Sequence, residues 1–260
     1  MGQVTGTTEK FLKEILRDKA ALFWTIAFPI FWVIIDCFAF VKSEWMPEEV
    51  IPLVRGSYTI SIAIFAIMLS TIVGLSSSIA SDREKGLLSK LLSMPINPWI
   101  DSFGRLLGSL AFSALAAGLV FVVGSICGAR FHSAYLGILE SVGFFLLAFF
   151  ASVGIGLTIG TFVKREYGAT MTGVGIAVGT AAMSGLFFPY SLLPSPLQIF
   201  ARIYPFSSCN SSVIFLLAGG EEAAGYNPLT AGHIAITITL SMALFIIGLA
   251  LYKRFCWGRR

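Results

Sequence analysis

Long apolar runs, separated by short polar stretches, dominate this chain. A helix that crosses a membrane needs roughly 20 apolar residues. Six runs exceed that length, at 21–41, 57–80, 103–128, 137–163, 168–188 and 231–252. The pattern therefore predicts an all-α integral membrane protein with six transmembrane helices, built as a single transmembrane domain over residues 1–260.

The first 20 residues carry a different pattern, with apolar and charged positions on opposite faces of a helix. Phe11 and Ile15 lie on one face, and Lys10 and Lys13 lie on the other. Residues 1–20 should form an interfacial helix along the inner membrane surface that leads into the first span. This stretch lacks the apolar core and small-residue cleavage site of a signal peptide, so we expect none.

The polar stretch at 81–98, between the second and third spans, also has helical features. Ser81 and Glu84 match a capping box, and Pro95 would end the helix. Leucines at helical spacing form one apolar stripe, at positions Leu87, Leu88, Leu91 and Leu92. Such a stripe requires a surface to cover it. One interpretation is a helix lying on lipid headgroups; the other is a helix that docks into a soluble partner.

The segment 188–230, before the last run, is too rich in apolar residues for a free loop. Prolines divide it into pieces too short to cross a membrane, at Pro189, Pro194, Pro196 and Pro205. We expect short outer helices, re-entrant or interfacial, between spans five and six. A soluble lid is the alternative, but it would expose a large apolar patch.

Small residues recur at every fourth position of the fifth run, at Ala169, Gly173, Ala177, Ala181 and Gly185. Such a ladder lets helix backbones approach closely in a membrane. It is a candidate dimer or packing face, and the spacing leaves open whether the partner helix belongs to the same chain or to a second copy.

Two acidic residues fall inside or beside spans, Asp36 in the first and Glu140 in the fourth. An acid within a span often marks function, but both lie near the outer ends, where a side chain can also reach water. Together with Phe187, Phe188 and Tyr190, they are our candidate residues for a transport pathway.

Composition and charge sharpen this picture. Hydrophobic residues make up 56% of the chain and charged residues only 12%, about half the charged share of a soluble domain. Of the 18 Lys and Arg residues, 14 fall in the N-terminus, the C-terminus and the alternate loops that include 81–98. By the positive-inside rule, both termini and 81–98 are cytoplasmic. The net charge of +4 reflects this bias and does not indicate nucleic-acid binding.

Motifs for catalysis or cofactor binding are not recognisable in the sequence. No Gly-x-x-x-x-Gly-Lys phosphate loop is present. His132 and His233 are far apart, without a Cys or carboxylate at metal-ligand spacing, and the four Cys show no paired spacing. We expect no metal site, no cofactor and no catalytic site in this chain.

The stretch Arg83, Glu84, Gly86, Leu87, Leu88, Leu91, Leu92 and Pro95, following the second of six spans, resembles the coupling segment of the type-2 ABC export permeases. The Pro-rich stretch before the last span is also similar to that family. The resemblance implies a coupling helix that inserts into a separate ABC ATPase subunit, where ATP and Mg²⁺ are bound. It also implies a second copy or a homologous permease as partner, in the plasma membrane.

The function that this resemblance implies is outward transport of an amphipathic or hydrophobic substrate, such as a drug, a lipid or a lipid-linked glycan. Two other classes stay open. An ion-coupled secondary transporter would need ionisable groups near mid-membrane, and an intramembrane enzyme would need a nucleophile–base or metal constellation.

Overall fold

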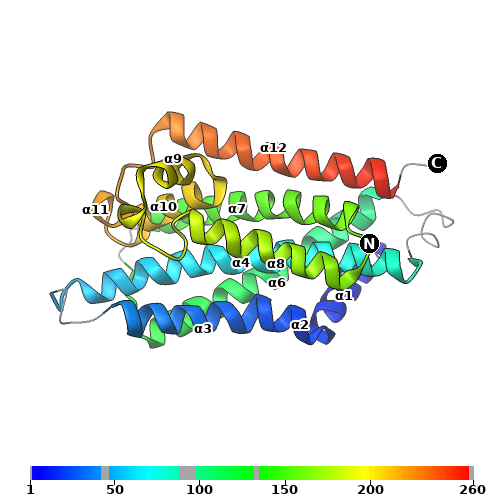
Figure 1. The fold of residues 1–260 in the computed structure, drawn as a ribbon, viewed down its shortest axis with the longest axis horizontal. Helices are drawn as coiled ribbons and strands as arrows, with labels where there is room; N and C mark the ends of the chain where they lie inside the picture. The colour runs from blue at the N-terminus through cyan, green and yellow to red at the C-terminus, as the bar shows by residue number, and fades with distance from the viewer. Residues whose placement is uncertain (1, 42–46, 88–97, 132–134, 258–260) are drawn as a thin grey trace.

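The computed structural model describes residues 2–41, 47–87, 98–131 and 135–257, and within these ranges the chain forms helices and no strand. Long helices run side by side in one elongated bundle, and both termini lie toward the same end of it (Figure 1).

The N-terminal part of the bundle begins with the amphipathic helix α1, Gly2–Arg17. Phe11 and Ile15 are buried, as expected from the periodicity, and a Cβ on Gly108 would lie 2.7 Å from the Phe11 ring. Their contacts are with α4 and α6, so α1 is part of the bundle as well as amphipathic. The first span then follows as one almost continuous helical rod, whose parts are α2 (Lys19–Leu22), η1 (Phe23–Ala27), α3 (Phe28–Ile35) and η2 (Asp36–Phe40). Both η1 and η2 are π-helical.

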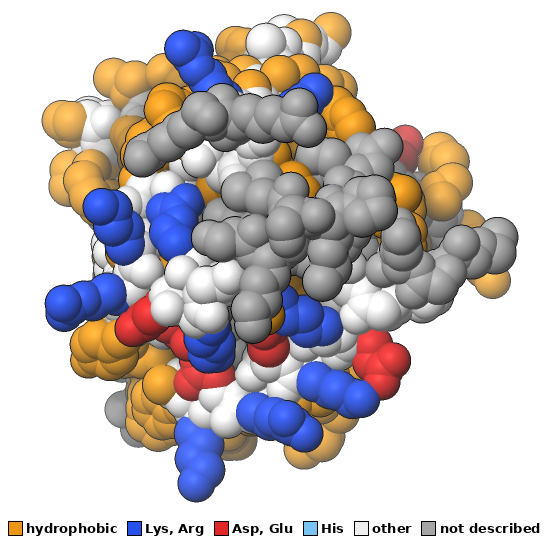
Figure 2. Space-filling model, turned by 90° about the vertical axis from the view of Figure 1, so that its right-hand side faces the viewer, with side chains coloured by type: hydrophobic (Ala, Val, Ile, Leu, Met, Phe, Trp, Pro, Cys, Tyr) orange, Lys and Arg blue, Asp and Glu red, His pale blue; other side chains and the backbone are white. Residues whose placement is uncertain are grey.

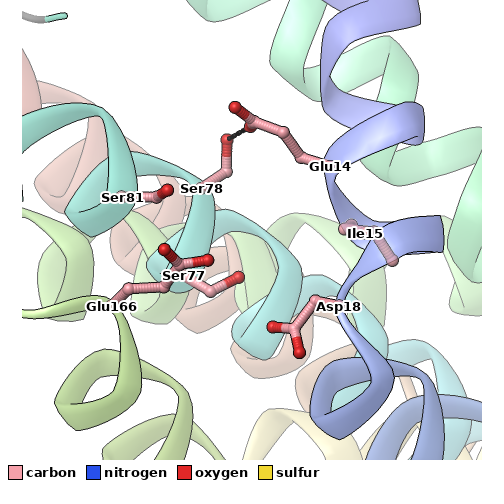
Figure 3. A pocket seen from close by; sticks show the side chains of 7 residues that line it. All are labelled: Glu14, Ile15, Asp18, Ser77, Ser78, Ser81 and Glu166. Carbon is pink, nitrogen blue, oxygen red and sulfur yellow. Dashed lines mark hydrogen bonds between the residues drawn. The ribbon is translucent and has the colours of Figure 1, made fainter. Parts of the chain in front are cut away.

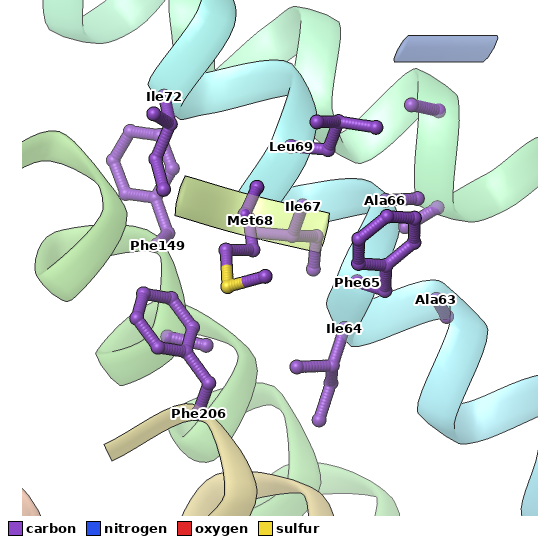
Figure 4. Close-up of a cluster of buried hydrophobic side chains, with 14 of the residues drawn as sticks. Ala63, Ile64, Phe65, Ala66, Ile67, Met68, Leu69, Ile72, Phe149 and Phe206 are labelled. Atoms are coloured by element: carbon purple, nitrogen blue, oxygen red, sulfur yellow. The ribbon is translucent and has the colours of Figure 1, made fainter. Parts of the chain in front are cut away.

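Helix α4, Ile51–Glu84, occupies the centre of the bundle, and its apolar window is completely buried. The long helices around it include α6 (Pro98–Ile126), α7 (Tyr135–Phe162) and α8 (Glu166–Met183). Aliphatic side chains of α4 pack against Phe149 and Phe206 to form the core (Figure 4). Several hydroxyls within α4 donate to the preceding turn; Ser70 Oγ, for example, donates to Ala66 O at 2.6 Å.

Helix α12, Ala231–Cys256, packs along α7 at a contact between two glycines. A Cβ on Gly154 would lie 2.1 Å from Leu244 O, and one on Gly248 would lie 2.3 Å from Gly154 O. The two backbones therefore touch, which only glycine allows at these positions.

The Pro-rich segment forms short helices, as predicted: η3 (Tyr190–Leu192), α9 (Ser195–Ile203), α10 (Pro205–Leu217) and α11 (Glu221–Ala224). Helix α10 is buried among α4, α7 and α12, whereas α9 keeps an exposed apolar side. A soluble lid is therefore the wrong description of α10.

Five helices of the described chain are long and apolar enough to cross a membrane: Lys19–Ala39, Ile51–Glu84, Trp99–Ile126, Tyr135–Phe162 and Ala231–Cys256. They coincide with five of the six predicted runs. The remaining run, 168–188, forms α8, which has 18 residues and lies beside α4 in the bundle.

Candidate functional site

Basic side chains gather at one end of the bundle, which we call the basic end (Figure 2). It comprises α1, the last turns of α4, the start of α6, the α7–α8 connection and the end of α12 (Figure 1). Eleven of the 14 Lys and Arg residues that the structure describes lie here: Lys10, Lys13, Arg17, Lys19, Arg83, Lys85, Arg105, Lys164, Arg165, Lys253 and Arg254.

The predicted coupling segment begins at this end, but not as a separate helix. The expected helix start at Ser81 is wrong, because α4 continues without a break to Glu84. Lys85 is its C-cap, and Gly86 turns the chain at φ = +69°, a conformation that favours glycine. Ser81 is buried within α4, and its hydroxyl accepts from Lys85 Nζ at 2.5 Å instead of capping a new helix. A Ser-x-x-Glu pattern also occurs inside helices. Here α4 continues because Asp82, Arg83 and Glu84 are bound by other helices.

Of the predicted partner-contacting residues, the structure describes only Arg83, Glu84, Gly86 and Leu87. The others, Leu88, Leu91, Leu92 and Pro95, lie outside the described residues. What the structure shows is therefore the base of the coupling segment, where it joins α4.

A buried ion-pair network surrounds this base, centred on Arg105 of α6. The Arg105 side chain is only 3% exposed. Its guanidinium contacts Asp82 on α4, donates from Nε to Asp101 Oδ2 at 2.9 Å, and donates from Nη1 to Ser78 Oγ at 2.8 Å. A fully buried cation is stable only when it is paired in this way.

Two further elements join the same network. Lys10 of α1 donates to Asp82, so that carboxylate has a cation on each side. Tyr252 of α12 is buried and donates its hydroxyl to Asp101 Oδ2 at 3.0 Å. The network thus ties together α1, α4, α6 and α12. By contrast, the exposed pair of Lys13 and Glu9 on α1 is local; the hydrogen bond from Lys13 lowers the pKa of Glu9.

The predicted coupling residues Arg83 and Glu84 bind neighbouring helices. Arg83 donates to Thr161 O of α7 at 2.7 Å and to Cys256 Sγ of α12 at 3.1 Å. Glu84 Oε2 accepts from the backbone N of Glu166 at 2.9 Å, so it satisfies a free N–H at the start of α8. Both side chains therefore bind the end of α4 to the neighbouring helices α7, α8 and α12.

A small polar cleft lies beside the network, between α1, α4 and the start of α8 (Figure 3). Its lining residues are Glu14, Ile15, Asp18, Ser77, Ser78, Ser81 and Glu166. Ser78 Oγ bonds Glu14 Oε2 at 3.0 Å across it. No group of three or more His, Cys, Asp or Glu side chains within the described ranges is arranged to hold a metal ion.

The candidate pathway residues do not form one cluster. Asp36 is fully buried, and neither carboxylate oxygen has a hydrogen-bond partner. Glu140 is exposed on α7. Phe187 is buried with its ring 4.7 Å from that of Trp32, whereas Phe188 is 43% exposed.

Tyr190 belongs to a separate cluster at the opposite end from the basic end. Arg202 Nε donates to its hydroxyl at 2.6 Å, and the Arg202 guanidinium lies 5.1 Å from the centre of the Tyr226 ring. Burial raises the pKa of Tyr226. This cluster ties η3 and α9 to the segment before α12.

The small-residue ladder is covered within the chain. Ala169, Ala177 and Ala181 are fully buried, and a Cβ on Gly173 would lie 3.3 Å from both Ile72 and Ser76 of α4. These four residues pack α8 on α4, whereas Gly185 lies beyond the end of α8, where a Cβ would lie 3.4 Å from Leu193. Gly175 and Gly179, on the other side of α8, have open space beside them.

Sequence reasoning missed the centre of the site. The sequence pattern did not single out Arg105, Asp101 or Tyr252. A usable signal existed: Asp101 and Arg105 are four residues apart at the start of an apolar run, a spacing at which opposite charges pair.

Comparison with known proteins agrees with this picture of a membrane transport component. The sequence model of a family described as ABC-2 type transporter matches residues 2–217. YvfS of Bacillus subtilis (strain 168), provisionally named a transport permease, is 22% identical over 210 residues, covering 81% of this chain and 83% of that protein. An uncharacterised transporter of Cutibacterium acnes, PPA2034, is 26% identical over 162 residues, covering 59% of this chain and 29% of that protein.

Proposed function

The chain belongs to the ABC-2 type transporter family, and on that premise we propose that it is the permease subunit of an exporter driven by ATP hydrolysis on a separate subunit. The partner would bind ATP and Mg²⁺, and this chain would contribute neither a nucleotide site nor a catalytic group.

The observation that carries the proposal is the network at the base of the coupling segment. Any force on residues 85–98 acts first on the last turn of α4. In that turn, Asp82 is bonded to α1 and α6, Arg83 to α7 and α12, and Glu84 to α8. A single docking point could thus move most of the bundle, as a transporter powered from outside the membrane requires.

The docking contact itself would come from the leucine stripe of the coupling segment. Burying one leucine at an interface contributes roughly 1.5–3 kcal/mol before association costs. Leu88 and Leu91 together could therefore supply most of a modest docking free energy. The ATPase subunit, rather than the lipid surface, would be the partner that covers them.

The topology that fits this role has six spans, with α8 as the fifth and both termini in the cytoplasm of a cell whose plasma membrane holds the protein. Tight packing on α4 would compensate for the lower hydropathy of α8. Helices α9 and α10 would then be re-entrant or interfacial elements of the outer leaflet. The basic end would face the cytoplasm, in line with its excess of Lys and Arg.

A second permease copy, or a homologous permease, would complete the transporter. The first span exposes large apolar side chains, such as Phe31 and Phe38 at 60% each. Gly175 and Gly179 give the uncovered side of α8 a smooth surface. This surface is close in sequence to Phe187, whose ring contacts that of Trp32. These two surfaces are the ones we assign to the partner permease.

The substrate would be amphipathic or hydrophobic, as for a drug, a lipid or a lipid-linked glycan. Aromatic rings of the first span, α4 and the segment after α8 meet in one cluster: Phe28, Trp32, Phe65 and Phe187. Such rings suit an apolar substrate better than a hydrated ion.

The coupling helix provides the test. In the double variant Leu88→Asp, Leu91→Asp, two charges replace the proposed docking surface, so the permease should insert normally but lose co-purification with its ATPase subunit and lose ATP-driven transport. Leu192→Asp, an exposed leucine at the opposite end, is the matched control and should retain both.

Wild-type co-purification and transport by the double variant would contradict the proposal and favour a lipid-bound loop. A second candidate function, an ion-coupled transporter, is favoured only by the buried Asp36 carboxylate. Substrate exchange by the purified permease in the absence of any ATPase would decide for that candidate.

A further inference from the structure

Asp36 is the most unusual ionisable group in the described chain. It is the first residue of η2, its side chain is 0% exposed, and neither Oδ1 nor Oδ2 has a hydrogen-bond partner. The alternative that it reaches water at the outer membrane surface is therefore wrong for this conformation. Burying an ionised carboxylate without a partner costs several kcal/mol, and a cation placed beside it would offset that cost.

Within the described ranges, no cationic side chain is bonded to Asp36. Arg55 of α4 is the basic residue on the neighbouring helix, but its Nη1 donates to Cys127 O at 3.0 Å and its guanidinium lies 5.7 Å from the Phe38 ring centre. Tyr58 of α4 and the Cys37 thiol are the other titratable groups near Asp36. Neither can supply a positive charge.

A cluster of aromatic rings begins one helical turn before Asp36 on the first span. Trp32 is one helical turn away on the same face of the first span, and its Nε1 is also buried without a partner. The Trp32 ring is 4.7 Å from Phe187, which in turn is 4.9 Å from Phe65. A single negative charge beside a group of ring faces is the chemistry that binds a hydrophobic organic cation.

The first span is also the element best placed to open this site. Only 33% of its apolar window is buried, against 100% for α4. It has a π-helical segment on each side of α3, and the outer one begins at Asp36 itself. Such segments recur at functional sites in helices. Movement of this span away from α4 would expose Asp36 and Trp32 to the same space.

We propose that Asp36, Trp32 and Phe187 form a recognition site for a hydrophobic organic cation, which enters between the first span and α4. This inference rests on the proposed export function and names its substrate class. Asp36 pairs with the positive charge, and the rings of Trp32 and Phe187 contact the apolar part. The exposed Glu140 has no part in it.

Binding to the purified permease tests the site without the ATPase. Equilibrium dialysis against proteoliposomes would compare the tetraphenylphosphonium cation with neutral triphenylphosphine oxide. Asp36→Asn should weaken binding of the cation by about 10- to 100-fold, as expected for the loss of one buried charge pair, and leave the neutral probe unchanged. Glu140→Gln, which removes an exposed acid, should change neither.

Three results would overturn the inference: equal cation binding by Asp36→Asn and wild type, equal loss of both probes, or no specific cation binding by the wild type. Stimulation of ATP hydrolysis by the cation in the reconstituted complex is the accompanying measurement. Failure of the complex to assemble would refute the export function, while cation binding that depends on Asp36 would still stand.

Discussion

Arg105 is the residue on which the basic end depends most directly. Its side chain contacts two carboxylates and a hydroxyl from two helices, and almost none of it reaches solvent. Buried ion pairs often add little net stability compared with apolar residues, but removing one partner leaves the other charges unpaired. The network therefore fixes one arrangement of the helices instead of simply strengthening the fold.

Replacing Arg105 by methionine tests this role. In Arg105→Met, the Asp82 and Asp101 carboxylates lose their shared cation, and the free energy of unfolding should fall by about 3–5 kcal/mol. Thermal unfolding in detergent would measure it. Lys13→Met, which breaks only the exposed pair with Glu9, is the control and should leave the unfolding temperature unchanged.

A rescue experiment separates charge from packing in the same network. Adding Asp101→Asn to Arg105→Met removes the carboxylate that is left without a cation, whereas Asp82 keeps Lys10, so part of the lost stability should return. A double variant as unstable as the sum of its single variants would show that Arg105 acts through its shape and not through its charge.

At the scale of the helices, close backbone contact decides which neighbours α4 and α7 take. In α7, Gly154, Gly156 and Gly160 lie where another helix crosses, whereas Gly143 has no neighbour within 4 Å. The crossing of α7 and α12 is the tightest, since Gly154 and Gly248 bring their backbones into direct contact. Apolar content alone would not distinguish these positions from the rest of each helix.

Adding a single methyl group at this crossing should force the helices apart. Gly154→Ala would place its Cβ 2.1 Å from Leu244 O, which is backbone and cannot rotate away. We expect a loss of about 1–3 kcal/mol in the free energy of unfolding. Gly143→Ala in the same helix meets no atom within 4 Å and should be neutral. Equal stability of the two variants would mean that α7 and α12 are not in contact at Gly154.

At the scale of the whole molecule, the two ends of the bundle have different constructions. The basic end is held by buried ion pairs among α1, α4 and α6 and by hydrogen bonds to α7, α8 and α12. The opposite end is held by aromatic and hydroxyl contacts of the short helices, such as Arg202 with Tyr190 and Tyr226. In a transporter, this asymmetry would let one end receive force and the other rearrange around the substrate.

Helix α8, the proposed fifth span, is the part of this architecture that labelling can test. In a background without the four native cysteines, Lys164→Cys and Ser191→Cys place one exposed thiol on each side of α8. If α8 crosses the membrane, a membrane-impermeant maleimide should label position 164 from the cytoplasm and position 191 from outside. Labelling of both positions from one side would refute the six-span topology.

The sequence by itself determined the class of this protein and most of its spans. Five of the predicted runs are helices of membrane-crossing length, and the pattern around Phe11 correctly predicted a helix with one apolar face, which packs on α4 and α6. Prolines likewise marked the breaks between the short helices after α8. These features depend on hydrophobic content and local backbone chemistry, which a linear pattern records.

Only the tertiary structure decided where the polar groups find their partners. Ser81 reads as a helix start, yet α4 continues because Asp82, Arg83 and Glu84 are bound by helices from distant parts of the chain. Asp36 reads as a residue that can reach water, yet α4 covers it. The cost of burying a charge depends on which helices surround it, and that arrangement follows from packing between segments far apart in the sequence.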